Sequence, residues 1–192
     1  MKVTAFNGSA RMNGNTTILL NTVLEELREE GIETELVHLS ELEIKGCTAC
    51  YQCWNNKDQQ CAVDNDDVNE LVDKMVHSEG IILGSPTYFA DITSEMKALV
   101  DRAGMVSKAN EDMLKRKVGA AVVVARRAGS IHAFDSLNHF FFIGEMIVPG
   151  ASYWNVGFGR EIGEVAKDEE ALGTMKTLGQ NMAWLMKKIY SK

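Results

Sequence analysis

The chain has 192 residues, a length that suits one domain with a core large enough to fold alone. Its 20 basic and 27 acidic residues give a formal net charge of −7, so it is a poor candidate for binding nucleic acid or an anionic membrane. The hydrophobic content of 45% excludes a disordered chain, and no apolar run is long enough to cross a bilayer. The polar residue Asn7 comes too early for a signal peptide, and we therefore expect a cytoplasmic protein.

Short β-rich runs alternate with helical patterns along the chain. We expect strands at 2–6, 34–39, 80–83, 118–125 and near 146–148. Helical spacing of apolar residues predicts helices at about 16–30, 68–75, 94–102, 130–143 and 169–189. This alternation predicts an α/β fold with a doubly wound, five-stranded parallel sheet and helices on both faces. Ligands of such folds bind beyond the carboxyl ends of the strands, so the loops after the strands are the candidate site.

The loop after the first expected strand, residues 8–17, combines small residues with hydroxyls and a cation. It has neither the GxGxxG spacing of dinucleotide folds nor the GK[ST] ending of triphosphate loops. Ser9, Thr16 and Thr17 offer hydroxyls, Arg11 offers charge, and a helix N-terminus favours an anion. Together these features predict a site for a monophosphate. The alternative is that Asn15 or Thr16 only caps the helix.

The loop after the third expected strand, residues 84–93, contains Pro86, Tyr88 and Phe89. Proline fixes one backbone angle, and the aromatic residues add flat apolar surface. Such a loop could set backbone N–H groups against the edge of a planar heterocycle and cover its face. The alternative is a turn that places two aromatic side chains in the core.

These two loops, GSARMNGNT and GSPTYFADITSEMKALVDR, resemble those of the flavodoxin-like NAD(P)H-dependent FMN reductase family, and the resemblance extends through VGAAVVVARRAG. In that family the first loop binds the FMN phosphate and the second packs along the isoalloxazine ring. The resemblance implies one flavodoxin-like FMN-binding domain over residues 1–192, with NAD(P)H as a candidate electron donor. The residues that it assigns to FMN are Ser9, Arg11, Asn15, Thr16 and Thr17 for the phosphate, Pro86, Thr87, Tyr88 and Phe89 for the ring, and Arg126 and Gly129 near the pyrimidine edge.

All four cysteines lie between positions 47 and 61, in the pattern C-x2-C-x2-C-x7-C. Three thiols at this spacing can surround one cubane, and a nearby fourth can complete the ligation of a [4Fe–4S] cluster. A zinc site, a CxxC redox pair and four free thiols are the alternatives.

The cysteine motif lies between the second strand and second helix of an FMN reductase-like chain, where it resembles that of the iron–sulfur flavoproteins. Those proteins carry FMN and a [4Fe–4S] cluster. The resemblance implies that a cysteine-rich loop at about residues 45–64 binds the cluster through Cys47, Cys50, Cys53 and Cys61. Because this loop follows the expected neighbour of the first strand, we expect it on the flavin side of the molecule.

We therefore expect an FMN-dependent oxidoreductase, an iron–sulfur flavoprotein that passes electrons between the cluster and FMN, with no side chain required as general acid or base. The alternatives are a cluster-free NAD(P)H-dependent FMN or quinone reductase and a non-enzymatic, flavodoxin-like electron carrier. The redox partner would be a small molecule or a protein such as a ferredoxin. Phe140–Phe142 and Trp54 exceed what one core needs, so we expect a homodimer or homotetramer with the flavin near a subunit boundary.

Overall fold

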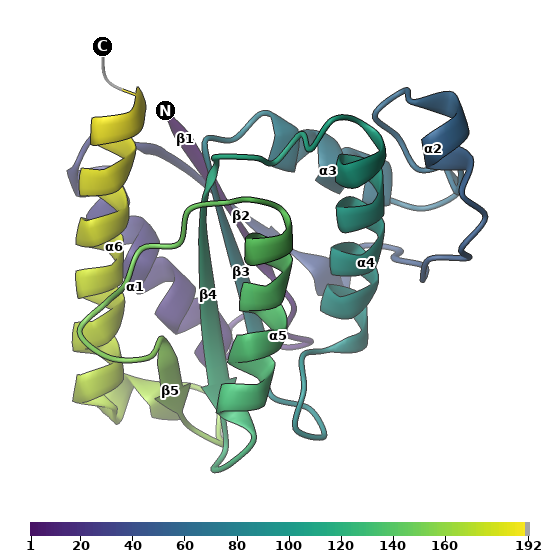
Figure 1. The fold of residues 1–192 in the computed structure, drawn as a ribbon. Coiled ribbons are helices and arrows are strands. Elements are labelled where there is room, and N and C mark those ends of the chain that lie inside the picture. The colour runs from purple at the N-terminus through teal and green to yellow at the C-terminus, as the bar shows by residue number, and fades with distance from the viewer. Residues whose placement is uncertain (191–192) are drawn as a thin grey trace.

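A computed structural model describes residues 1–190 of the chain (Figure 1). Five strands form one sheet in the order β2-β1-β3-β4-β5, and every neighbouring pair is parallel. The strands are β1 (Lys2–Asn7), β2 (Glu33–His38), β3 (Gly80–Pro86), β4 (Val118–Ala125) and β5 (Val156–Phe158). The predicted α/β class and parallel sheet are confirmed, with β1 and β2 as neighbours.

Six α-helices and two short 3₁₀ helices lie between the strands or after the last one within the described residues. The α-helices are α1 (Asn15–Glu29), α2 (Gln52–Asn56), α3 (Val68–Val76), α4 (Ser94–Ala109), α5 (Ser130–Ile143) and α6 (Glu169–Tyr190), and the 3₁₀ helices are η1 (Leu39–Glu41) and η2 (Glu164–Lys167). Helix α4 runs past its predicted end because Val106 and Ala109 continue its buried face. None of the helices in residues 1–190 combines the length and the apolarity that a bilayer crossing requires.

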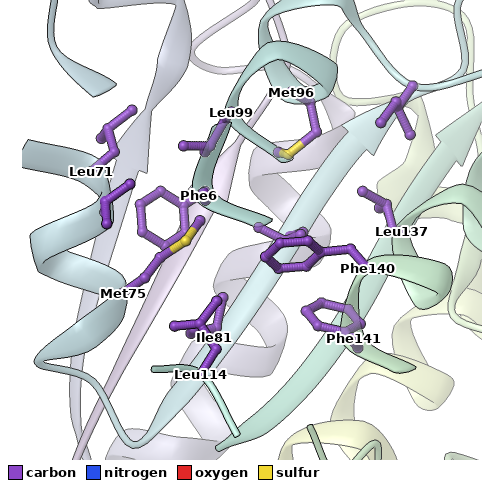
Figure 2. Close-up of a cluster of buried hydrophobic side chains, with 14 of the residues drawn as sticks. Phe6, Leu71, Met75, Ile81, Met96, Leu99, Leu114, Leu137, Phe140 and Phe141 are labelled. Carbon is purple, nitrogen blue, oxygen red and sulfur yellow. The ribbon is translucent and has the colours of Figure 1, made fainter. Parts of the chain in front are cut away.

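The sheet separates two apolar cores, as a strand period of two residues requires. Ile81 and Leu83 of β3 point to the side covered by α3, α4 and α5, whereas Ile82 points to the side covered by α1 and α6. Figure 2 shows the first of these cores, in which Phe6 packs near Met75. All eight residues of β4 are buried, so helices cover this strand on both faces of the sheet. The loop at its carboxyl end therefore starts from a rigid part of the core.

The predicted fifth strand near 146–148 is wrong. Ile147 forms only an isolated bridge with Val118 at the amino end of β4, and Pro149 then removes the next backbone donor. The strand at this edge is instead β5, which pairs with the carboxyl half of β4 through Val123 and Val156. Its three residues include a glycine, and this gave too weak a periodic signal to be found from the sequence.

Candidate functional site

A hollow of about 160 Å³ at the carboxyl ends of β3 and β4 brings the two predicted flavin loops together. Its lining is Ser9, Arg11, Asn15, Thr16, Pro86, Thr87, Tyr88, Val124, Ala125, Arg126, Gly159 and Arg160. Eight of these twelve residues were predicted from the sequence. The three other predicted residues lie outside this lining: Thr17 in the first turn of α1, Phe89 in the second flavin loop, and Gly129 just before α5.

The N-terminus of α1 faces this hollow with its backbone donors uncapped. The N-cap position is Gly14, no side chain of residues 1–190 caps the helix, and no acidic residue lies in its first turn. The Asn15 side chain instead donates to the carbonyl of Glu161 (2.9 Å) and accepts from the N–H of Val165 (3.3 Å). The capping alternative for Asn15 and Thr16 is therefore wrong, and the positive end of the helix is available to an anion.

The first loop is shaped by its own hydrogen bonds. The Arg11 N–H donates to Ser9 Oγ at 3.1 Å, and the Arg11 guanidinium donates to the carbonyl of Arg160 at 3.2 Å. Thr17 is used internally, because its hydroxyl donates to the carbonyl of Met12 and accepts from Asn7 Nδ2 at 2.9 Å. Ser9 and Arg11 thus lie in the hollow while Thr17 holds the loop behind them.

In the second loop, Thr87 carries an unpaired polar atom. Its backbone N–H donates to the carbonyl of Val124 at 2.7 Å, which extends the pairing of β3 with β4 past Pro86. Its Oγ1 is buried and has no hydrogen-bond partner among residues 1–190. Such an atom costs about 1–3 kcal/mol of stability unless something else pairs with it. Because Thr87 lines the hollow, a bound ligand could supply that partner.

The tip of the second loop projects into solvent. Tyr88 and Asp91 exchange backbone hydrogen bonds of 2.8 and 3.1 Å across a two-residue turn. Phe89 and Ala90, at the turn, have left-handed φ angles of 48° and 68°, which non-glycine residues rarely adopt. Phe89 is fully exposed and Tyr88 is 46% exposed, so the alternative that both aromatic side chains lie in the core is wrong.

Gly129 supports the second loop from the side of α5. Its φ is +86°, and a Cβ at this position would lie 2.9 Å from Ala90 Cα and 3.1 Å from Thr87 Cγ2. Only glycine combines this backbone conformation with so close an approach. Gly129 therefore sets where the second loop lies, while Arg126, three residues earlier, reaches the hollow itself.

Sequence reasoning missed four residues of the lining, namely Val124, Ala125, Gly159 and Arg160. Arg160 is the most consequential, because with Arg11 and Arg126 it makes three cations around one hollow in an acidic chain. Such a concentration of charge favours an anionic group. Ligand-binding loops follow strands, so a correct fifth strand would have pointed to Arg160. Because the fifth strand was predicted near 146–148, the loop after β5 was not considered as part of the site.

A second, smaller hollow of about 20 Å³ is lined by all four cysteines. Cys47 and Cys50 are exposed, Cys53 is buried and Cys61 is half-buried. Within residues 1–190 no three His, Cys, Asp or Glu side chains are arranged closely enough to hold a single metal ion. A zinc site would need sulfur atoms about 3.8 Å apart, because each Zn–S bond is about 2.3 Å. The cysteines thus face one space but are not gathered around one ion.

Cys61 is the most firmly held of the four cysteines. Asn69 of α3 accepts from its backbone N–H (2.8 Å) and donates to its carbonyl (2.9 Å). Arg102 of α4 is fully buried and donates from Nε to Cys61 Sγ at 3.3 Å. The Arg102 guanidinium also pairs with the fully buried carboxylate of Asp66.

Burial and hydrogen bonding shift the pKa values of Arg102 and the cysteines in opposite directions. Burial lowers the pKa of Arg102, but its hydrogen bonds and ion pairing with Asp66 and Cys61 outweigh that effect and raise it. Burial raises the pKa of Cys53, with smaller contributions from the charges of Cys61 and Cys50. The pKa of Cys50 is lowered by hydrogen bonds from the backbone of Gln52 and the Thr48 side chain. The thiols therefore differ in their readiness to become thiolates, the form that binds iron.

The expectation that the cysteine loop lies on the flavin side of the molecule is wrong. The cysteine hollow includes Arg102, Met105 and Val106 of α4, which lie about 12–18 Å along the helix from Ser94 at a rise of about 1.5 Å per residue. Ser94 begins α4 directly after the second flavin loop. Figure 1 accordingly shows α2 beside the far half of α4, away from the tip of β4. After β2 the chain turns back along α4, which sequence order alone does not reveal.

The sequence and the fold both match known proteins. The sequence model of the NADPH-dependent FMN reductase family matches residues 1–161. An iron–sulfur flavoprotein of Methanocaldococcus jannaschii is 37% identical over 196 residues, covering 98% of this chain and 99% of that protein. One from Methanosarcina thermophila is 36% identical over 152 residues, 78% of each chain. The structure of an NAD(P)H:quinone oxidoreductase from Methanothermobacter marburgensis superposes with a TM-score of 0.71 at 14% identity, over 95% of this chain and 96% of that one.

Proposed function

The chain belongs to the NADPH-dependent FMN reductase family, and we propose that it is an iron–sulfur flavoprotein that passes electrons between FMN and a [4Fe–4S] cluster. Membership of this family makes it an FMN-dependent oxidoreductase. The observation that carries the proposal is that two separate hollows gather the two sets of residues: the flavin loops line one and all four cysteines line the other.

The residues of the first hollow fit FMN. Ser9, Arg11, Thr16 and the first-turn N–H groups of α1 would hold its phosphate, with Arg160 as an added cation. When bound, FMN supplies hydride acceptance and one-electron release. The residues that would line or support the ring are Pro86, Thr87, Tyr88, Phe89, Arg126 and Gly129, while Asn15 and Thr17 shape the phosphate loop. Thr87 lines the hollow, and its buried Oγ1 has no hydrogen-bond partner among residues 1–190, so it is the residue of this loop that we expect to gain a partner when FMN binds.

The residues of the second hollow fit a cluster better than a zinc ion. Four thiols provide Cys₄ ligation, and a cubane binds each sulfur at a different iron, so the sulfurs need not crowd around one ion. Ala49 and Tyr51, on either side of Cys50, have left-handed φ angles of 53° and 57°. This unfavourable backbone wraps the C-x2-C turns around the hollow and is typical of functional sites. When bound, the cluster would supply one-electron transfer.

Within one chain the cysteine hollow begins about 12 Å along α4 from the flavin loop, so a cluster could exchange electrons with the flavin of its own chain or of a neighbouring copy. We propose a homodimer or homotetramer with the flavin near a subunit boundary. Phe142 (62% exposed) and Trp54 (44% exposed) support this assembly, as does an apolar hollow of about 610 Å³ between α4 and α5.

The electron donor would be NAD(P)H or a ferredoxin-type protein, and the redox partner would be a small molecule or a protein. A cytoplasmic location fits this use of soluble donors. The residues of the chain bind and orient the cofactors, and no side chain is required to move a proton in a step that we assign.

A cluster-free NAD(P)H-dependent FMN or quinone reductase is the second candidate. The observation that favours it is that, within the described residues, the cysteine sulfurs are not gathered at metal-binding distance. In that case the cysteine loop would be a surface feature without redox function. A flavodoxin-like carrier would share both the fold and the flavin but would not oxidise NAD(P)H in steady state.

The test is the Cys50→Ala variant, with Gln60→Ala as a matched control because Gln60 is also exposed in the cysteine loop. We expect Cys50→Ala to lose iron and electron transfer to a one-electron acceptor but to keep FMN and its reduction by NADPH. Gln60→Ala should behave as the wild type. Equal one-electron transfer in the wild type and Cys50→Ala would favour the cluster-free reductase. Failure of the wild type to oxidise NAD(P)H with any acceptor would favour the carrier.

A further inference from the structure

Arg102 is a buried charge whose bonds all lead to one part of the chain. It lies in the middle of α4 and is completely inaccessible to solvent. Nε donates to Cys61 Sγ at 3.3 Å, and Nη1 donates to the carbonyl of Lys45 at 3.1 Å. Nη1 also pairs with the Asp66 carboxylate, and Nη2 donates to the carbonyl of Val63. One side chain therefore ties both ends of the cysteine loop, residues 45–64, to the core helix.

The ion pair with Asp66 orients the guanidinium. Asp66 Oδ2 also accepts from the N–H of Lys45 at 2.9 Å, and Oδ1 accepts from the N–H of Val68 at 3.3 Å. The carboxylate is thereby fixed between the start of the loop and the start of α3. A guanidinium has a planar fork of donors, so fixing one edge on Asp66 aims the remaining N–H groups. Nε then points at the sulfur of Cys61.

Anchoring the loop explains the bonds to Lys45, Val63 and Asp66 but does not require the bond to a cysteine sulfur. Burying an ion pair carries a large desolvation cost, and apolar residues of similar size often serve the fold equally well. The Arg102–Asp66 pair provides something that an apolar pair could not, namely an N–H donor to a cysteine sulfur. Hydrogen bonds to ligand sulfurs stabilise the added negative charge of a reduced cluster and raise its reduction potential.

We propose that Arg102 is a positioning residue of the cysteine site, which holds the loop against α4 and raises the reduction potential of the cluster through its bond to Cys61. The second half of this proposal rests on the cluster proposed above. The first half concerns only the chain and holds with or without iron.

The test compares Arg102→Gln, Arg102→Lys and Asp66→Asn in anaerobically prepared holoprotein by a redox titration followed by electron paramagnetic resonance. Arg102→Gln should lower the equilibrium constant for cluster reduction about tenfold, which is about 59 mV for one electron. Arg102→Lys keeps the charge but loses the Nε–H, and should show a smaller fall; it also serves if Arg102→Gln does not fold. Asp66→Asn removes a negative charge and keeps an acceptor, and should shift the potential upward.

The control is Lys117→Met, which removes a half-buried cation outside the cysteine loop. Lys117 donates to the carbonyls of Val76 (2.7 Å) and Ser78 (2.6 Å), on the turn before β3. Its loss should destabilise the fold without moving the cluster potential. If Arg102 has only a structural role, none of these variants should shift the reduction potential of the cluster. Loss of loop structure alone would instead make Asp66→Asn lower the potential, as Arg102→Gln does. Either result would overturn the claim that Arg102 raises the reduction potential.

Hydrogen exchange on the iron-free protein tests the anchoring half separately. Residues 45–64 should exchange faster in Arg102→Gln than in the wild type, whereas Lys117→Met should leave their exchange unchanged. Equal exchange in Arg102→Gln and the wild type would overturn the anchoring half. Wild-type protein that binds no iron would instead overturn the proposed cluster, and the redox half with it, while the exchange result would still decide the anchor.

Discussion

Replacing Thr87 by valine should move the stability of the FMN-free protein and its affinity for FMN in opposite directions. Thr87 Oγ1 is buried without a hydrogen-bond partner among residues 1–190 and lies at the hollow that we assign to FMN. An unpaired buried hydroxyl costs about 1–3 kcal/mol. Valine has nearly the same shape and no hydroxyl, so Thr87→Val should make the FMN-free protein more stable by about 1 kcal/mol.

The same hydroxyl should contribute to binding when FMN is present. A net hydrogen bond is worth about 1 kcal/mol, so Thr87→Val should raise the dissociation constant of FMN about fivefold. Urea unfolding of the FMN-free protein measures the first effect, and a midpoint higher by roughly 0.4 M is expected. Quenching of flavin fluorescence on titration measures the second.

Thr22→Val is the matched control for this experiment. The Thr22 hydroxyl already donates to the carbonyl of Ile18 at 3.0 Å, on a part of α1 outside the hollow. Its removal should not stabilise the protein and should leave FMN affinity unchanged. If Thr87→Val instead destabilises the FMN-free protein and binds FMN as the wild type does, the hydroxyl is paired within the chain and our account of the hollow is wrong.

Three further predictions concern the flavin site and the assembly. Arg11→Ala should raise the dissociation constant of FMN tenfold or more in a fluorescence titration, because a charge-assisted bond to phosphate is lost. Arg28→Ala, which removes an exposed cation at the far end of α1, should leave the dissociation constant unchanged. Gly129→Ala should lower stability by about 1–2 kcal/mol in urea unfolding, because φ is +86° and its Cβ would collide with the second loop, whereas Gly173→Ala in an open helical position should be neutral or stabilising. Phe142→Glu should yield smaller particles in sedimentation velocity, and an unchanged particle size would place the subunit contact elsewhere.

The periodic elements and the loops that follow clear strands could be predicted from the sequence. The limits of α5 were predicted at 130–143 and lie there, because its apolar pattern is bounded by glycines at both ends. The phosphate and ring loops follow β1 and β3, two strands with strong apolar runs. Parallel strands bring their carboxyl ends together, so Ser9 and Thr87 were expected at one site although 78 positions separate them.

The features that depend on tertiary packing could not be predicted. The three-residue strand β5 has little periodic pattern of its own and is formed by pairing with β4. Because β5 was not predicted, Arg160 in the loop after it was not predicted either. The cysteine loop turns back along α4 because Arg102 and Asp66 hold it there, and nothing in the local sequence marks an arginine as a partner of residues about 40 positions earlier. Likewise, Phe89 is aromatic yet fully exposed, because a turn with left-handed backbone directs it outward.

Anaerobic purification with FMN, iron and sulfide counted per chain tests the central claim most directly. The account predicts about one FMN, about four iron atoms and about four sulfides per chain, bound through Cys47, Cys50, Cys53 and Cys61. One FMN with no iron in protein that was never exposed to oxygen would contradict it and leave a cluster-free reductase.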